Sequence, residues 1–174
     1  MRKLKVDLGE LEMALDNSFP EHRYFLDLET GKVILVTDET SRKLEEIYAE
    51  LPDDAEDEQI VDAIRQRNLQ DWQKEELLQA DQVERGYRTR YIRIEAGDPH
   101  ADYRAMEDFI STVKDARLRD RLGRAISGRG AFRYFKDMLE DDPRERERWF
   151  ALKDAQVHQR ILNWLAEENI EPIE

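Results

Sequence analysis

Apolar residues recur every three or four positions over long stretches of the chain, a spacing typical of amphipathic helices. The first such stretch covers residues 8–17, and Asp7 with Glu10 three residues later has the spacing of a helix capping box. The same spacing resumes near Asp38 and is broken at Pro52. The pattern therefore predicts two helices in the first third of the chain.

Between these two helices the pattern becomes that of β-strands. Strands are expected at residues 22–28 and 32–37, and in the first of them Tyr24, Leu26 and Leu28 alternate with Arg23, Phe25 and Asp27. The turn sequence Glu29-Thr30-Gly31 separates them, and Gly31 can take a positive φ, so a β-hairpin is predicted. A third strand is expected at residues 87–95, where aromatic and β-branched residues are dense.

The other segments are predicted to be helical. Residues 55–84 are acidic and helical in pattern, and residues 66–70 form either a kink or a loop. Further apolar stripes of helical spacing follow from about residue 99. A last helix is expected to begin at Asp142-Pro143, because aspartate is a good N-cap and proline suits the first helical position.

The last helix carries the densest group of large side chains. Core positions are expected for Trp149, Phe150 and Trp164, because they have helical spacing with Val157 and Ile161. Trp149 and Phe150 are adjacent and so point about 100° apart on a helix. At least one of that pair is therefore expected near the edge of the core.

These elements predict an α+β fold that is helix-rich, with a small antiparallel sheet of about three strands packed against several helices. Residues 1–174 are expected to form a single globular domain, with an N-terminal α/β part (1–97) and a C-terminal helical part (98–174) as its natural subdivision. A chain of this length buries roughly two thirds of its unfolded surface, which suffices for a stable core.

Composition narrows the kinds of chemistry and the cellular location. The chain has no cysteine, which excludes disulfides, thiolate metal sites and a cysteine nucleophile, and which suits a reducing cytoplasm. No stretch approaches the ~18 apolar residues that a membrane-spanning helix needs. We therefore expect a cytoplasmic protein with no membrane partner.

Charge is strongly negative overall but unevenly distributed. The net charge is −13, which favours solubility and repels polyanions at long range. Residues 37–84 contain 16 acidic and 5 basic side chains, whereas residues 114–136 contain 8 basic and 2 acidic ones. This contrast is the strongest physical indication of a binding surface in the sequence.

Within the basic segment we single out a candidate site for an anion or an acidic partner. Exposed N–H groups at a helix N-terminus favour anions, and arginines three or four positions apart share a helix face. The candidate residues are Arg117, Arg121, Arg124, Arg129, Gly130 and Arg133. The alternative is structural: Gly128 is a helix C-cap, and the arginines pair with acids such as Asp137 and Glu140.

No catalytic or metal-binding constellation is found in the sequence. The three histidines, His22, His100 and His158, are far apart and lack zinc-site spacing. No serine lies in a nucleophile elbow. We therefore assign no catalytic, metal or cofactor residues and expect no cofactor; whether the protein is an enzyme stays open, with a non-enzymatic role favoured.

The run GRGAFRYFKDMLEDDPRERERWFALKDAQVHQRILNWL, residues 128–165, resembles the C-terminal signature of a bacterial family of uncharacterised proteins, one of the "UPF" groups. YRAMEDFISTV and YFLDLETGKVI are similar to other parts of that family's pattern. The resemblance implies a cytosolic bacterial protein of unassigned function, and it supplies no catalytic residues.

The function itself is unknown from sequence, and three hypotheses remain. The first is a non-enzymatic protein-interaction or regulatory module that binds a protein partner or a second copy of itself. The alternative is a phosphate- or nucleic-acid-binding protein that uses the arginine-rich patch at residues 117–136. This alternative ranks second because the negative net charge of the chain disfavours binding of a polyanion. The least favoured is an enzyme that uses a carboxylate such as Asp27, Glu29 or Asp102 with an arginine, because no pair of carboxylates stands out.

Overall fold

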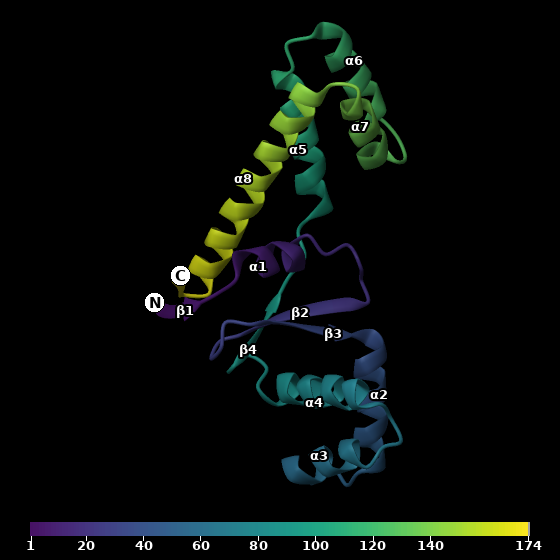
Figure 1. Ribbon diagram of the computed structural model, residues 1–174, viewed down its shortest axis with the longest axis vertical. Helices are drawn as coiled ribbons and strands as arrows, with labels where there is room; N and C mark the ends of the chain where they lie inside the picture. The colour runs from purple at the N-terminus through teal and green to yellow at the C-terminus, as the bar shows by residue number, and fades with distance from the viewer. Residues whose placement is uncertain (174) are drawn as a thin grey trace. The chain divides into compact units, whose positions relative to one another are not determined.

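A computed structural model describes residues 1–173 as two compact units, each of which is considered by itself. The first unit is Met1–Ala96 together with the last residues from Leu165 onward, and the second is Gly97–Trp164 (Figure 1). The predicted helix-rich α+β class is confirmed, since eight helices accompany a three-stranded antiparallel sheet and a small parallel strand pair in the described residues.

The first unit contains the strands and half of the helices. In chain order these are β1 (Arg2–Lys5), α1 (Leu8–Leu15), β2 (His22–Asp27), β3 (Val33–Thr37), α2 (Asp38–Glu50), α3 (Asp57–Arg65), α4 (Asp71–Arg85), β4 (Tyr91–Ile94) and β5 (Ile170–Ile173). The segment between Arg65 and Asp71 is thus a loop, which settles the alternative that the sequence left open.

The sheet has the order β3-β2-β4, and both pairings are antiparallel. The hairpin prediction is confirmed, with Tyr24 opposite Leu35 and Gly31 at a φ of 73° in the turn. The third strand is shorter than expected. Residues 86–91 form a tight turn in which the N–H groups of Arg90 and Tyr91 both donate to the Gly86 carbonyl, so only Tyr91–Ile94 pairs with β2.

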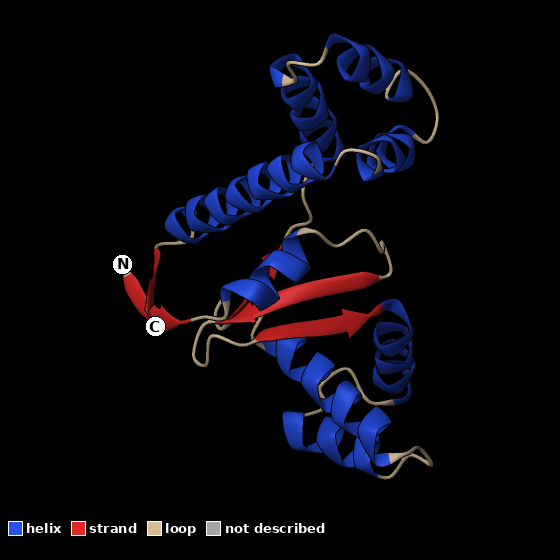
Figure 2. Ribbon diagram, turned by 45° about the horizontal axis from the view of Figure 1, so that its top comes forward, coloured by secondary structure: helices blue, strands red, loops and turns tan. Residues whose placement is uncertain are grey.

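Both faces of this sheet are covered by helices (Figure 2). Phe25 and Ile34 lie on one face and join a buried cluster with residues of α2 and α4, among them Leu44 and Leu77. On the other face α1 contacts β3 and β4, and Leu26 is fully buried. Alternate residues of β2 therefore point into two different apolar layers.

A second, parallel pairing joins the two ends of the chain. β1 runs beside β5, with Arg2 opposite Ile170 and Leu4 opposite Pro172. Neither strand is among the predicted elements, because four-residue strands carry too little periodicity to be recognised. Leu4 and Ile170 are both buried, so this pair adds apolar contact as well as backbone hydrogen bonds.

The second unit consists of helices: α5 (Pro99–Thr112), α6 (Ala116–Ala125), α7 (Ala131–Glu140) and α8 (Pro143–Glu167), the last of which continues into the first unit. Its core centres on Phe109, Phe135 and Trp149, whose rings meet edge to face at centroid distances of 4.8–6.0 Å. Such contacts are favourable beyond the area that they bury.

Two adjacent aromatic side chains of the last helix differ in burial, because neighbouring residues point in different directions on a helix. Trp149 is 4% exposed and Phe150 is 45% exposed, which confirms that one of the two lies at the edge. Trp164, which the sequence placed in the core, is only half-buried. Asp142 caps α8 by accepting the backbone N–H of Glu145 at 3.2 Å, as predicted.

Candidate functional site

The helix α6 presents a row of arginines on one face. Arg117, Arg121 and Arg124 follow one another at intervals of four and three residues, so they lie on one side of the helix. Leu118 and Leu122 are buried in the core of the second unit, and their burial fixes the rotation of the helix about its axis. The amphipathic pattern thus leaves all three arginines exposed.

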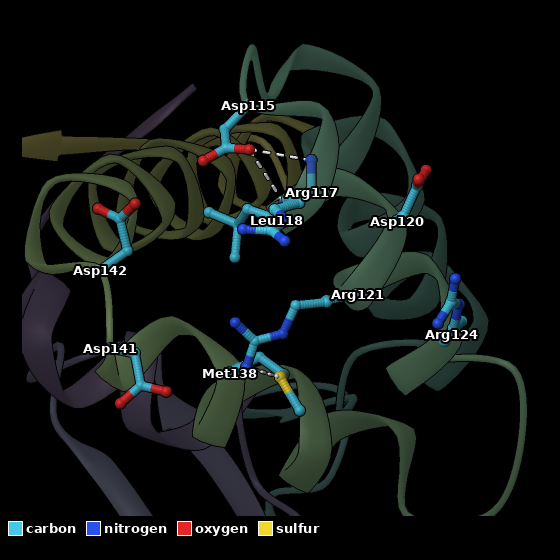
Figure 3. A pocket seen from close by; sticks show the side chains of 9 residues that line it. All are labelled: Asp115, Arg117, Leu118, Asp120, Arg121, Arg124, Met138, Asp141 and Asp142. Carbon is cyan, nitrogen blue, oxygen red and sulfur yellow. Dashed lines mark hydrogen bonds between the residues drawn. The ribbon is translucent and has the colours of Figure 1, made fainter.

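These arginines line a hollow of about 580 Å³, which we call the α6–α7 hollow. Figure 3 shows its walls. The lining residues are Asp115, Arg117, Leu118, Asp120, Arg121, Arg124, Met138, Asp141 and Asp142. They come from α6 and its cap, from α7, and from the turn into α8.

The α6–α7 hollow is lined by both signs of charge, and its α6 side carries Asp115 and Asp120 as well as the three arginines. The arginines belong to α6, whereas Asp141 and Asp142 lie across the opening, at the turn between α7 and α8 (Figure 3). Asp142 is engaged as the cap of α8. Asp115 likewise caps α6, where it accepts the backbone N–H of Arg117 at 2.9 Å. The cap roles offset part of the negative charge, since helix N-termini favour anions.

The three arginines of the hollow have no close acidic partner. Among the described residues, no carboxylate oxygen lies within 4.0 Å of the guanidinium of Arg117, Arg121 or Arg124. Arg121 instead donates to the sulfur of Met138 at 3.4 Å, and a thioether is a weak acceptor. Strong, charged donors are therefore left available to a ligand.

The remaining candidate residues do not line the α6–α7 hollow. Arg129 and Gly130 lie in the exposed connection between α6 and α7, and Gly130 adopts a φ of 73° before α7 begins. Arg133 is 85% exposed and lies 3.9 Å from Asp137. The α6 cap is Ile126 rather than Gly128. The structure therefore brings together Arg117, Arg121 and Arg124 and leaves the other candidates outside the hollow.

Four aspartates and one methionine of the hollow were missed by the sequence analysis as site residues: Asp115, Asp120, Met138, Asp141 and Asp142. Asp142 was recognised, but only as a helix cap. Its approach to α6 depends on the way α7 packs between its neighbours, and no local pattern in the sequence carries that information.

Two buried carboxylates of the first unit are held by hydrogen bonds. Asp27 accepts Nε and Nη2 of Arg90 at 3.0 and 2.8 Å, and it also accepts the backbone N–H of Glu29. Burial by itself would raise the pKa of Asp27, but these bonds outweigh it and lower the pKa to about 2. The pair ties β2 to the start of β4, which is a structural role.

The second buried carboxylate is Asp81 on α4. It accepts the hydroxyl of Tyr48 at 2.7 Å and forms an ion pair with Arg85 at 2.6 Å. Burial and the hydrogen bond to Asp81 raise the pKa of Tyr48, so this phenol stays protonated. Tyr48 and Asp81 thereby join α2 to α4.

Residues 1–173 contain neither a grouping of metal ligands nor a helix suited to span a membrane. In that part of the chain no three His, Cys, Asp or Glu side chains are grouped so that they could hold a metal ion. No described helix is both long enough and apolar enough to cross a membrane.

Comparison with known proteins places the chain in a family. The model of an uncharacterised protein family, UPF0158, matches residues 69–174, more than half of the chain. The chain therefore belongs to the UPF0158 family, and the resemblance to a bacterial family of uncharacterised proteins is confirmed.

A relative supports the same assignment over nearly the whole chain. The UPF0158 protein PA5073 of Pseudomonas aeruginosa is 26% identical over 172 residues, which cover 99% of this chain and 88% of the relative. No solved structure matches the chain. The family is described as uncharacterised, so the comparisons assign no function and the function must be argued from the site.

Proposed function

We propose that the protein is a non-enzymatic cytoplasmic interaction module, whose second unit binds a charged segment of a partner protein in the α6–α7 hollow. The observation that carries this proposal is the row of Arg117, Arg121 and Arg124. All three open into one hollow, and none has a carboxylate within 4.0 Å in the described part of the chain. Guanidinium groups bind carboxylates through paired, charge-assisted hydrogen bonds.

The opposite wall of the hollow favours a protein segment over a nucleic acid. A polyanion would bring successive phosphates against Asp141 and Asp142, and it would approach a chain whose net charge is −13. A peptide can place acidic side chains against the arginines and a basic one against the aspartates. The presence of arginines and aspartates in one hollow thus supports a partner of mixed charge.

The proposal is tested by a pull-down from bacterial lysate with the full chain, half of the lysate being treated with nuclease. The triple variant Arg117→Gln/Arg121→Gln/Arg124→Gln removes the row. The control Arg42→Gln/Arg65→Gln/Arg144→Gln removes the same charge from exposed positions outside the hollow.

We expect a protein that survives nuclease, is retained by the control and is lost from the triple variant. Retention by the triple variant would contradict the proposal. Loss on nuclease treatment would favour the nucleic-acid alternative, whose affinity should fall steeply with salt. If the captured protein is the chain itself, the partner is a second copy, and analytical ultracentrifugation should show the same dependence on the three arginines.

A further inference from the structure

A separate groove lies in the first unit, between the sheet and the helices that cover it. It consists of two adjoining hollows of about 200 and 270 Å³, which share Arg23, Phe25, Val83 and Glu84 as walls. Together they fall in the size range of small-molecule pockets. We call this space the sheet groove; its lining residues include residues of β2, β4, α2 and α4.

Two arginines reach the sheet groove from neighbouring strands. Arg93 on β4 is directly opposite Phe25 on β2, and Arg23 lies two residues before Phe25. Because side chains alternate along a strand, Arg23, Phe25 and Arg93 are on the same face of the sheet. The pairing therefore places two positive charges beside one aromatic ring.

Neither arginine is well neutralised by the protein. The Nε of Arg23 lies 3.9 Å from a carboxylate oxygen of Asp38, and the Nε of Arg93 lies 3.7 Å from one of Glu95. Both distances exceed those of a charge-assisted hydrogen bond. Arg23 also donates from Nη2 to the hydroxyl of Ser41, a neutral acceptor.

One donor of Arg23 has no acceptor at all. Its Nε is buried and, among the described residues, is the one buried side-chain polar atom without a hydrogen-bond partner. Buried polar groups are almost always paired, and an unpaired one calls for an explanation. The side chain as a whole is 31% exposed, so an anion can approach the rest of the guanidinium.

The other walls of the groove define the body of the ligand. Tyr87 is 45% exposed and meets the buried ring of Phe25 edge to face at 6.3 Å, so an aromatic surface lies beside the arginines. Glu45 and Glu84 line the helical side. The negative charge of these two side chains disfavours a polyanion, so a single anionic group is expected to bind on the strand side of the groove.

We propose that the sheet groove binds a small organic anion, whose carboxylate or phosphate lies between Arg23 and Arg93 and whose apolar or aromatic body contacts Phe25 and Tyr87. This site is independent of the α6–α7 hollow, since the two share no lining residue.

Isothermal titration calorimetry on the full chain tests the proposal with three probes: phenyl phosphate, inorganic phosphate and phenol. We expect saturable binding of one phenyl phosphate per chain, weaker binding of inorganic phosphate and no measurable binding of phenol. This order follows because only phenyl phosphate satisfies both the arginines and the aromatic wall.

Variants locate the bound anion. Arg93→Gln should weaken phenyl phosphate binding about 10- to 100-fold, the usual effect of losing a charge-assisted hydrogen bond. Tyr87→Ala should weaken phenyl phosphate while leaving inorganic phosphate unchanged. Arg65→Gln, an exposed charge on α3, and Arg121→Gln, in the α6–α7 hollow, should bind like the unmodified chain.

Three results would overturn the proposal: no saturable binding of phenyl phosphate, unchanged affinity in Arg93→Gln, or a loss of affinity in Arg121→Gln with Arg93→Gln unaffected. The last result would place the anion in the α6–α7 hollow. Arg93 is 45% exposed at its side chain, so its substitution should leave the fold intact, and an unchanged melting temperature checks this.

Discussion

Asp27 illustrates how single residues stabilise the hairpin turn. Its carboxylate accepts two hydrogen bonds from Arg90, one from the backbone of Glu29 and one from the hydroxyl of Thr30. All of these donors favour the ionised form, and together they outweigh the cost of burial. The turn, β2 and the start of β4 are thereby held by one charged side chain.

The lowered pKa of Asp27 predicts an acid-sensitive contribution to stability. Because the folded pKa of about 2 lies below the ordinary value of 3.8, the carboxylate stabilises the fold above pH 3.8, and this contribution is lost as the pH falls toward 2. Its size is about 2 kcal/mol. Urea unfolding from pH 5 to pH 2 should show a steeper loss for the unmodified chain than for Asp27→Asn.

The control for Asp27→Asn is a variant that loses a carboxylate but keeps the hydrogen bonds of Asp27. Asp54→Asn, at an exposed position, should follow the unmodified chain at every pH. An Asp27→Asn variant with the same acid dependence as the unmodified chain would refute the assignment. At neutral pH that variant should also be less stable by about 2–3 kcal/mol.

The two glycines with positive φ predict very different costs of substitution. Both Gly31 and Gly130 have a φ of 73°, but a Cβ on Gly31 would lie 1.7 Å from the Lys5 carbonyl oxygen, whereas one on Gly130 would first meet the Tyr134 ring at 3.2 Å. Backbone strain alone costs about 1–2 kcal/mol. Thermal denaturation should show Gly130→Ala destabilised by about 1 kcal/mol and Gly31→Ala by about 3 kcal/mol or more, the excess reflecting the collision. Equal shifts would contradict this.

At the scale of secondary-structure elements, Trp149 is the side chain by which α8 enters the buried apolar cluster of the second unit. Trp149 packs between Phe109 and Phe135 at 5.2 and 4.8 Å, which joins α5, α7 and α8 in a single aromatic contact. Its neighbour Phe150 lies 45% exposed on another side of the helix. Burial on α8 thus follows the rotation of the helix rather than residue type.

This difference in burial predicts that truncating these two neighbouring side chains to alanine destabilises the protein by very different amounts. Trp149→Ala should lower the free energy of unfolding by about 3–5 kcal/mol, since it removes a buried aromatic ring and leaves a cavity. Phe150→Ala should cost less than about 1 kcal/mol. Chemical denaturation followed by circular dichroism gives both values, and comparable losses in the two variants would show that the packing of α8 is wrong.

At the scale of the whole molecule, the strand pair β1–β5 joins the two ends of the chain within the first unit. Arg2 also donates to the Leu28 carbonyl, and a Cβ on Gly31 would reach the Lys5 carbonyl. The pair therefore packs against the hairpin turn that Asp27 stabilises. Stability of the first unit is therefore expected to depend on β5, which is far along the sequence from the other strands of that unit.

Substitutions in β5 test this dependence. Ile170 is 2% exposed and Ile173 is 43% exposed in the same strand. Ile170→Ala should cost about 2–4 kcal/mol because it empties a buried position, while Ile173→Ala should cost under about 1 kcal/mol. Differential scanning calorimetry measures both, and an unchanged transition in Ile170→Ala would mean that the terminal pair is dispensable.

Local patterns determined most of the secondary structure before any packing was known. Interactions between residues a few positions apart produce the hairpin with its turn at Gly31, the cap at Asp142 and the helical stripes. Such interactions can be recognised directly in the sequence. The row of arginines on α6 follows from the same periodicity. So does the contrast between an acidic middle and a basic segment, because charge is carried by composition.

Only the tertiary structure decided which distant groups meet. No short-range pattern predicts that β1 pairs with β5 or that Asp141 and Asp142 lie across from Arg121. Nor does such a pattern show that Trp149 is buried while Trp164 is only half-buried. Such contacts arise when elements pack so as to bury the most apolar surface with every buried polar group paired. That requirement applies to the folded unit as a whole, so it cannot be evaluated from a local segment of the sequence.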